Sequence, residues 1–282
     1  MTWLASYPKS GNTWLRALLF AYKNDGSIDI NKMSSTGVAD THVQYMQIVS
    51  PLDMKHLGIL GQHMLRPSML LHQLVMWPIR PMFVKTHMAN VIPPNLGPFI
   101  PPLVTERAVY LVRDPRDVFQ SMIKYLGVTS DEMIENFKND QFCLGINRDN
   151  TLISQICGWS THVKSWTTER IFPILTIRYE DMLLDSAEVL ASVIKFCGEE
   201  PNEILVKKSA EACNIERLRE QEDSHGFIEG TADTIDKFFG SGGSYWKNEL
   251  DSKYVVQIER DHREMMIQMN YELSVTPKLE VV

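Results

Sequence analysis

A strand that turns sharply into a helix near the start of this 282-residue chain constrains its fold more than any other feature. The apolar residues 3–6 are typical of a buried strand, residues 7–11 of a Pro/Gly turn, and residues 15–22 of a helix. A connection of this kind aims unpaired backbone N–H groups and the positive end of the helix dipole at one point. The sequence therefore predicts a phosphate-binding site in this turn.

The side chains in and after the turn fit a phosphorylated nucleotide. Lys9 supplies a mobile positive charge, Gly11 lets the backbone come close, and the hydroxyl groups of Ser10 and Thr13 can donate to phosphate oxygens. Trp14 offers a flat apolar face on which a base can stack. The turn is not a Walker A loop, because its lysine precedes the glycine and no Gly-Lys-Ser/Thr occurs anywhere in the chain.

Residues 7–14 read Tyr-Pro-Lys-Ser-Gly-Asn-Thr-Trp, which resembles the 5′-phosphosulfate loop of the soluble sulfotransferases. The usual form of that loop is Tyr-Pro-Lys-Ser-Gly-Thr-Thr-Trp, and only Asn12 departs from it, at a position where the family uses mainly backbone. The resemblance implies that 3′-phosphoadenosine-5′-phosphosulfate (PAPS) is the donor and that residues 9–14 bind it. The alternative is an ordinary strand-turn-helix connection with a buried tryptophan.

The alternation of apolar runs and helical patterns predicts one α/β domain over residues 1–275, with residues 276–282 as a poorly ordered tail. Apolar runs at 82–85, 108–112 and 174–177 are typical of buried parallel strands. Helices are expected at 117–126, 152–168, 187–197, 203–213 and 251–269, with helix-like spacing at 64–75 and a loop at 25–40. We expect a central parallel sheet flanked by helices, which the resemblance makes the P-loop-NTPase-like fold of the sulfotransferases.

Composition narrows the classes of partner and the compartment. A net charge of −7 argues against non-specific nucleic-acid binding. The four cysteines form no C-x-x-C pair and show no metal spacing, and no apolar run approaches the ~18 residues of a membrane span. We expect free thiols, a cytoplasmic protein, and neither a nucleic-acid nor a membrane partner.

Residues 83–87 form the second chemical feature, a strand that ends in a cation and an imidazole. Ligands of open α/β sheets bind beyond the carboxyl ends of the strands, where Lys85 and His87 are expected. A histidine there can take a proton near neutral pH, although a lone histidine is more often structural. The stretch resembles the family's Lys-Thr-His segment, which implies that His87 is the catalytic base while Lys85 and Lys9 neutralise charge on the transferred group.

Residues 108–121 form the third feature, a strand that ends at Arg113 before a helix that Pro115 begins. An arginine fork and a helix hydroxyl can together bind one phosphate. The spacing from Arg113 to Ser121 matches the family's 3′-phosphate segment and implies that these two residues are its ligands. We expect the neighbouring Arg116 and Asp117 to be largely structural.

Two later segments resemble the family less closely. Residues 179–182 read Tyr-Glu-Asp-Met, which implies that Tyr179 lies near the adenine. Residues 214–219 look like the Ser-Phe-x-x-Leu-Arg stretch of bacterial members, but Asn214 and Ile215 replace the hydroxyl and the aromatic residue there.

Residues 238–247 depart most clearly from the family pattern Arg-Lys-Gly-x-x-Gly-x-Trp-Lys. One alignment places Phe239 and Gly240 where the Arg-Lys pair should bind the 3′-phosphate, and another places Gly240 and Ser241 there before Gly242. We expect this loop to contact the nucleotide, with Arg113, backbone amides of the loop or a nearby lysine such as Lys237 supplying the binding. The family's dimer signature, Lys-x-x-x-Thr-Val-x-x-x-Glu, also fails here, so dimerisation by that route is not supported.

The sequence thus predicts a PAPS-dependent sulfotransferase that acts on a hydroxyl or amine of a small organic acceptor, such as a secondary metabolite or natural product, and that needs no metal. Two alternatives stay open: a P-loop-type small-molecule kinase, which would need magnesium and ATP, and a non-catalytic nucleotide-binding protein. The segment 42–102, rich in methionine and proline, is expected to form an adaptable wall of the acceptor site, or else to fill gaps in the core.

Overall fold

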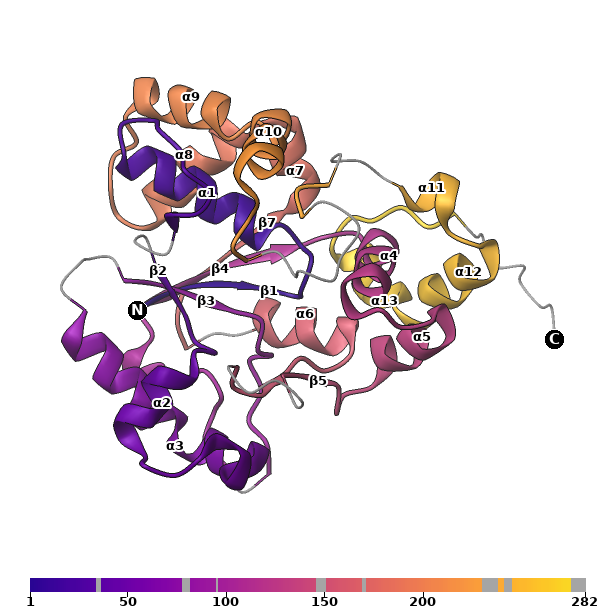
Figure 1. Cartoon of the computed structure of the whole chain (residues 1–282). Helices are drawn as coiled ribbons and strands as arrows, with labels where there is room; N and C mark the ends of the chain where they lie inside the picture. Colours follow the sequence, from indigo (N-terminus) through magenta and orange to yellow (C-terminus); the bar gives the residue numbers. More distant parts are fainter. Residues whose placement is uncertain are drawn as a thin grey trace.

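Five parallel strands form the central sheet of the protein, as a computed structural model shows (Figure 1). The structure describes residues 1–33, 37–77, 82–94, 96–145, 151–168, 171–229, 238–240 and 245–274. The sheet order is β2 (Gly37–Ala39), β3 (Phe83–Thr86), β1 (Thr2–Ser6), β4 (Arg107–Val112) and β7 (Ile174–Arg178). In the middle, Leu4 of β1 is paired with Lys85 of β3 and with Val109 of β4. The predicted parallel sheet is confirmed.

The alternation of side chains along β1 divides the core into two layers, one on each face of the sheet. Trp3 packs in a cluster with Trp159 and Trp166 of α6 (Trp159–Thr167), whereas Leu4 packs on the opposite face with Leu15 of α1 (Asn12–Lys23). Figure 1 shows α1, α8 (Ser186–Phe196) and α9 (Glu203–Ala212) together on one face and α6 on the other. The sheet is therefore covered on both sides, as its continuous apolar strands require.

The remaining helices lie around these two layers. They are α2 (Val43–Val49), α3 (Met54–Met76), the 3-10 helix η2 (Pro102–Val104), α4 (Pro115–Leu126), α5 (Ser130–Lys138), α7 (Tyr179–Leu184), α10 (Ile215–His225), α11 (Trp246–Glu249), α12 (Ser252–Asp261) and α13 (Arg263–Gln268). The helices expected at 117–126, 187–197 and 203–213 are confirmed within two residues at each end. The expected tail at 276–282 lies outside the described residues.

The loop expected over residues 25–40 is wrong at its end, because Gly37–Ala39 forms the edge strand β2. Gly37 lies opposite Phe83, and a Cβ at Gly37 would lie 2.7 Å from the Phe83 carbonyl oxygen. The glycine that favoured a loop prediction is therefore needed in a strand, where two backbones approach closely.

Two expected helices are shorter than their sequence patterns suggested. The helix expected at 152–168 begins only at Trp159, because Ser154–Gln155 is strand β6 and pairs with β5 (Cys143–Leu144). The helix expected at 251–269 is broken at His262, whose backbone leaves helical geometry (φ −117°, ψ 12°). The ring of His262 is buried, and its Nδ1 is hydrogen-bonded to the Ser160 hydroxyl at 2.8 Å, so a tertiary contact accompanies the break.

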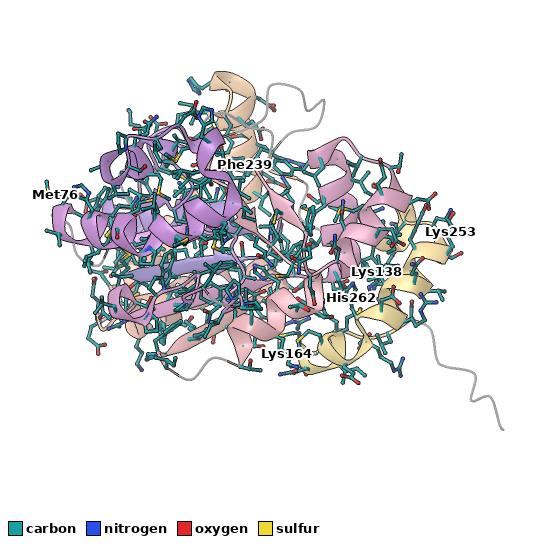
Figure 2. All side chains as sticks on the ribbon, turned by 90° about the horizontal axis from the view of Figure 1, so that it is seen from below. Met76, Lys138, Lys164, Phe239, Lys253 and His262 are labelled. Atoms are coloured by element: carbon teal, nitrogen blue, oxygen red, sulfur yellow. The ribbon has the colours of Figure 1, made fainter. Side chains whose placement is uncertain are left out.

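The methionines of the segment 42–102 fill the core or lie on the outer surface, whereas His42, Lys85 and His87 of the same segment line a cavity. Met46, Met54, Met69, Met82 and Met88 are all buried in the core, as the gap-filling alternative predicted. Two others, Met64 and Met76, are exposed, and Figure 2 shows Met76 at one end of the molecule, opposite Lys253. These methionines therefore belong to the core and the outer surface, away from the cavity described next.

Candidate active site

A cavity of about 870 Å³ lies at the carboxyl ends of the central strands. Its wall includes residues that follow four of those strands: Lys9 after β1, His87 after β3, Arg113 after β4 and Tyr179 after β7. The segments that carry them are far apart in the sequence, but parallel pairing brings their ends to one edge of the sheet. This is the edge at which open α/β sheets bind their ligands.

The loop between β1 and α1 is shaped by two left-handed residues. Lys9 has φ 66° and Gly11, which precedes α1, has φ 94°. Within the described part of the chain no side chain caps the first turn of α1, so its N–H groups are available to an anion. A Cβ at Gly11 would lie 2.6 Å from the Tyr179 ring, so glycine is required both for its conformation and for this close approach.

The loop side chains differ in what they can offer a ligand. Thr13 and Trp14 line the cavity, while the indole N–H of Trp14 donates to the Cys213 carbonyl at 2.8 Å. Asn12 also lines the cavity, but its side-chain amide donates to the Leu4 carbonyl at 2.9 Å and so anchors the loop. Ser10 is fully buried, and among the described residues its hydroxyl has no hydrogen-bond partner. A buried hydroxyl of this kind fits a loop that is completed by a ligand.

The ammonium group of Lys9 lies near the positive charges of Arg113 and Lys85. Its Nζ lies over the rings of Phe238 and Tyr125, at 4.5 and 5.2 Å from their centroids. Burial and the nearby charges of Arg113 and Lys85 lower the pKa of Lys9 to about 8. An anionic group in the cavity would relieve this electrostatic strain.

His87 is held in one orientation by the end of β1. Its Nδ1 lies 2.9 Å from the Ser6 carbonyl oxygen and 3.2 Å from the Ser6 hydroxyl; a proton on Nδ1 satisfies the shorter, carbonyl contact, and we assign that tautomer. Burial, with the charge of Lys85, lowers the pKa of His87 to about 3. The ring is therefore neutral at physiological pH, and Nε2 carries the lone pair that can accept a proton.

Two charged residues that the sequence did not single out connect to Lys85. Arg16 donates two hydrogen bonds of 2.8 Å to the Glu229 carboxylate, and the Lys85 ammonium approaches the same carboxylate at 3.4 Å. Arg16 stands one helical turn after Asn12 on α1, so helical spacing was a usable signal for it. No local signal could have found Glu229, which follows α10 and is remote in sequence from both partners.

Arg113, Ser121 and Tyr179 line the same cavity. The guanidinium of Arg113 donates from Nη1 to the Lys9 carbonyl at 3.1 Å and lies 4.4 Å from the Tyr179 ring centroid. Its buried Nε has no partner among the described residues. Asp117, which was expected to be structural, also lines the cavity and accepts the Trp246 amide at 3.1 Å.

The loop that departs from the family pattern contributes Phe239 and Gly240 to the wall, while Ser241, Gly242 and Lys237 lie outside the described residues. Figure 2 shows Phe239 between the two ends of the molecule that Met76 and Lys253 mark. Arg219 and Tyr245 line the same cavity, and the sequence did not single them out as candidate ligand-binding residues.

The described residues contain no group of three or more His, Cys, Asp or Glu side chains that could hold a metal ion. Within the same part of the chain, every helix is too short or too polar to cross a bilayer. The four cysteines are free thiols, as the sequence predicted.

Comparison with known proteins places these features in one family. Residues 1–270 match the family model of the sulfotransferase domain. Sulfotransferase 1 family member D1 of Mus musculus is 26% identical over 287 residues, which cover 93% of this chain and 82% of the mouse protein. Cytosolic sulfotransferase 17 of Arabidopsis thaliana is 25% identical, over 79% of this chain and 60% of that protein. The chain thus spans most of the mouse relative but less than two thirds of the plant one.

Solved structures share the fold. A retinol dehydratase in complex with retinol and PAP has a TM-score of 0.62 at 22% identity, covering 98% of this chain and 83% of that one. A mouse sulfotransferase complexed with PAP has a TM-score of 0.58 at 19% identity, covering 94% and 84%. The arrangement of sheet and helices described above is therefore the arrangement of these structures.

Proposed function

The chain belongs to the sulfotransferase domain family, and we propose that it transfers a sulfuryl group from PAPS to a hydroxyl or amine of a small organic acceptor. The proposal rests on one observation: the phosphate-type loop, the neutral His87 with an unprotonated Nε2, and Arg113 all line the same cavity. PAP is 3′-phosphoadenosine-5′-phosphate, which remains when PAPS has given up its sulfuryl group. The structural relatives that were solved with PAP therefore support this choice of donor.

His87 acts as the general base. Its Nδ1–H bond to Ser6 aims the unprotonated Nε2 into the cavity, where it accepts the proton of the acceptor hydroxyl or amine. The acceptor atom then forms a bond to sulfur while the bond between sulfur and the 5′-phosphate oxygen breaks. The products are the sulfated acceptor and the bisphosphate PAP, and the proton stays on His87 until water removes it.

Positive charge stabilises the phosphate that leaves. Lys9 and Lys85 both line the cavity, as do residues of the first turn of α1, whose N–H groups have no side-chain cap among the described residues. Groups fixed where charge develops lower the barrier without reorganising during the reaction. Arg113 and Ser121 bind the 3′-phosphate, and Tyr179 and Trp14 pack around the adenosine.

Part of the cavity wall is apolar. Ile30, Met33, Leu144 and Ile228 all line it, and they supply a surface suited to a small organic molecule. The retinol dehydratase structures that hold retinol or androsterone show acceptor-sized lipophilic ligands in a relative of the same fold. A natural-product acceptor and a cytoplasmic location remain predictions from the sequence.

Calorimetric titration of PAP and ADP tests the donor site. Wild type should bind PAP at least ~10-fold more tightly than ADP, because only PAP presents a 3′-phosphate to Arg113. In Arg113→Ala this preference should collapse while ADP binding persists. Equal binding of the two nucleotides by wild type, or a magnesium-dependent preference for ATP, would overturn the proposal in favour of a kinase or a nucleotide-binding protein.

A further inference from the structure

Arg219 contacts the loop from which the family's cationic pair is missing. In the sequence, Phe239 and Gly240 replace the arginine and lysine that bind the donor's 3′-phosphate in the family pattern. In the structure, the Phe239 carbonyl accepts a hydrogen bond of 2.7 Å from Nε of Arg219. The guanidinium of Arg219, on α10, is thus hydrogen-bonded to the backbone of the loop in which Phe239 and Gly240 stand in place of the cationic pair.

Three groups from different segments converge on this part of the cavity. Arg113, Arg219 and Tyr245 all line it. The hydroxyl of Tyr245 and Nε of Arg113 are both buried, and within the described ranges neither has a hydrogen-bond partner. Burial raises the pKa of Tyr245, whereas the charges of Arg219 and Arg113 lower it, so both guanidinium groups lie close to this phenol.

We propose that Arg219 and Tyr245 replace the missing Arg-Lys pair and, with Arg113, bind the 3′-phosphate of the donor. This inference rests on the proposed PAPS-dependent function. The terminal oxygens of a phosphate can accept hydrogen bonds from two guanidinium groups and one hydroxyl, and such charge-assisted bonds are the strong ones. A ligand here would also satisfy the two buried polar atoms that now lack partners.

The acidic groups nearby do not close this site to an anion. Asp117 and Glu249 line the same cavity. Asp117 accepts the backbone N–H of Trp246 at 3.1 Å, and burial raises its pKa to about 6 although Arg113 opposes the shift. These two carboxylates offset the charges of Arg113 and Arg219, so the attraction of the site for a phosphate rests on its hydrogen-bond donors as well as on charge.

Titration of PAP and ADP into Arg219→Gln tests the proposal. Glutamine can still donate a hydrogen bond to the Phe239 carbonyl but carries no charge, so the loop is disturbed little. We expect PAP affinity to fall ~10- to 100-fold with ADP affinity unchanged, as loss of a charge-assisted phosphate contact predicts. Tyr245→Phe should weaken PAP ~3- to 10-fold by the same criterion.

Arg217→Gln is the matched control, because Arg217 is exposed on the same helix. It should leave both affinities unchanged. An Arg219→Gln variant that keeps wild-type PAP affinity, or that loses PAP and ADP equally, would overturn the assignment. If wild type itself failed to prefer PAP over ADP, the donor proposal would fail first. A preference that is lost in Arg113→Ala but retained in Arg219→Gln would sink only the inference made here.

Discussion

The Nδ1 atom of His87 lies 2.9 Å from the backbone carbonyl oxygen of Ser6, at the end of the neighbouring strand. This contact holds the imidazole in one orientation, and the carbonyl, which only accepts, favours the tautomer with the proton on Nδ1. It also ties His87, the residue after β3, directly to the strand that leads into the phosphate-type loop. His87, the proposed base, and that loop are therefore positioned by the same pair of strands.

Replacement of His87 by alanine should lower kcat by ~10²- to 10⁴-fold, which is the usual contribution of a general base. PAP affinity should change little, since the donor loop keeps its own contacts. Steady-state kinetics with calorimetric titration of PAP measures both. His56→Ala, at an exposed position, is the control and should behave as wild type. Near-normal turnover in His87→Ala with intact PAP binding would remove His87 from this role.

Binding of PAP should weaken as the pH rises above about 8. Burial and neighbouring cations lower the pKa of Lys9 to about 8 in the free protein, so Lys9 loses its charge through this range. A bound anion favours the protonated form, and linkage then reduces PAP affinity by up to ~10-fold per pH unit above that pKa. Titrations between pH 6 and 10 give this profile.

Lys9→Arg provides the control for this pH dependence. Arginine keeps its proton throughout the range, so the fall in affinity attributable to residue 9 should disappear. A profile in Lys9→Arg identical to that of wild type would assign the titration to another group.

Replacement of Glu229 by glutamine should lower the free energy of unfolding by about 1–3 kcal/mol. Burial raises the pKa of the Glu229 carboxyl, but hydrogen bonds and attraction to Arg16 and Lys85 outweigh it and bring the pKa to about 2. In Glu229→Gln, the buried Arg16 and the half-buried Lys85 lose the carboxylate that they share. Because these side chains are partly exposed to water, the cost is smaller than that of breaking a fully buried ion pair. Urea unfolding measures the change.

An exposed pair offers the comparison for Glu229. Glu135 and Lys138 are 2.8 Å apart on α5 with side chains 65% and 45% exposed, so Glu135→Gln should cost less than about 0.5 kcal/mol. PAP should stabilise Glu229→Gln more than it stabilises wild type, because its phosphates restore negative charge. Equal effects of the two substitutions would show that the Arg16–Glu229–Lys85 cluster contributes no more than a surface pair.

A single added methyl group should disable the donor loop. In Gly11→Ala the new Cβ would lie 2.6 Å from the Tyr179 ring at a residue with φ 94°, so the loop or the ring must shift. We expect PAP affinity to fall at least ~10-fold and the unfolding free energy to fall by about 1 kcal/mol or more. Gly97→Ala, where nothing lies within 4 Å of the added carbon, should change neither quantity. Wild-type affinity in Gly11→Ala would show that the loop tolerates the shift.

The sequence alone determined the parallel sheet, most of the helices around it and the residues that follow the strands. These follow from local pattern: apolar runs predict buried strands, and the positions after Ser6, Thr86 and Val112 must lie at one edge of a parallel sheet. The order of Lys9, His87 and Arg113 along the chain was therefore enough to predict that they line one site. Family membership was equally readable, because the donor loop is a contiguous motif.

Only the tertiary structure decided which remote groups complete that site. Glu229, in the segment after α10, forms ion pairs with Arg16 of α1 and Lys85 of β3. Arg219 of α10 donates a hydrogen bond to the Phe239 carbonyl. The sequence patterns also predicted one continuous helix over 251–269, which is broken at His262, and left open whether the methionines line the site or fill the core. Each of these features depends on contacts between segments that are far apart in the chain. The periodicity of apolar residues shows which face of an element is buried, but it does not show which other segment packs against that face.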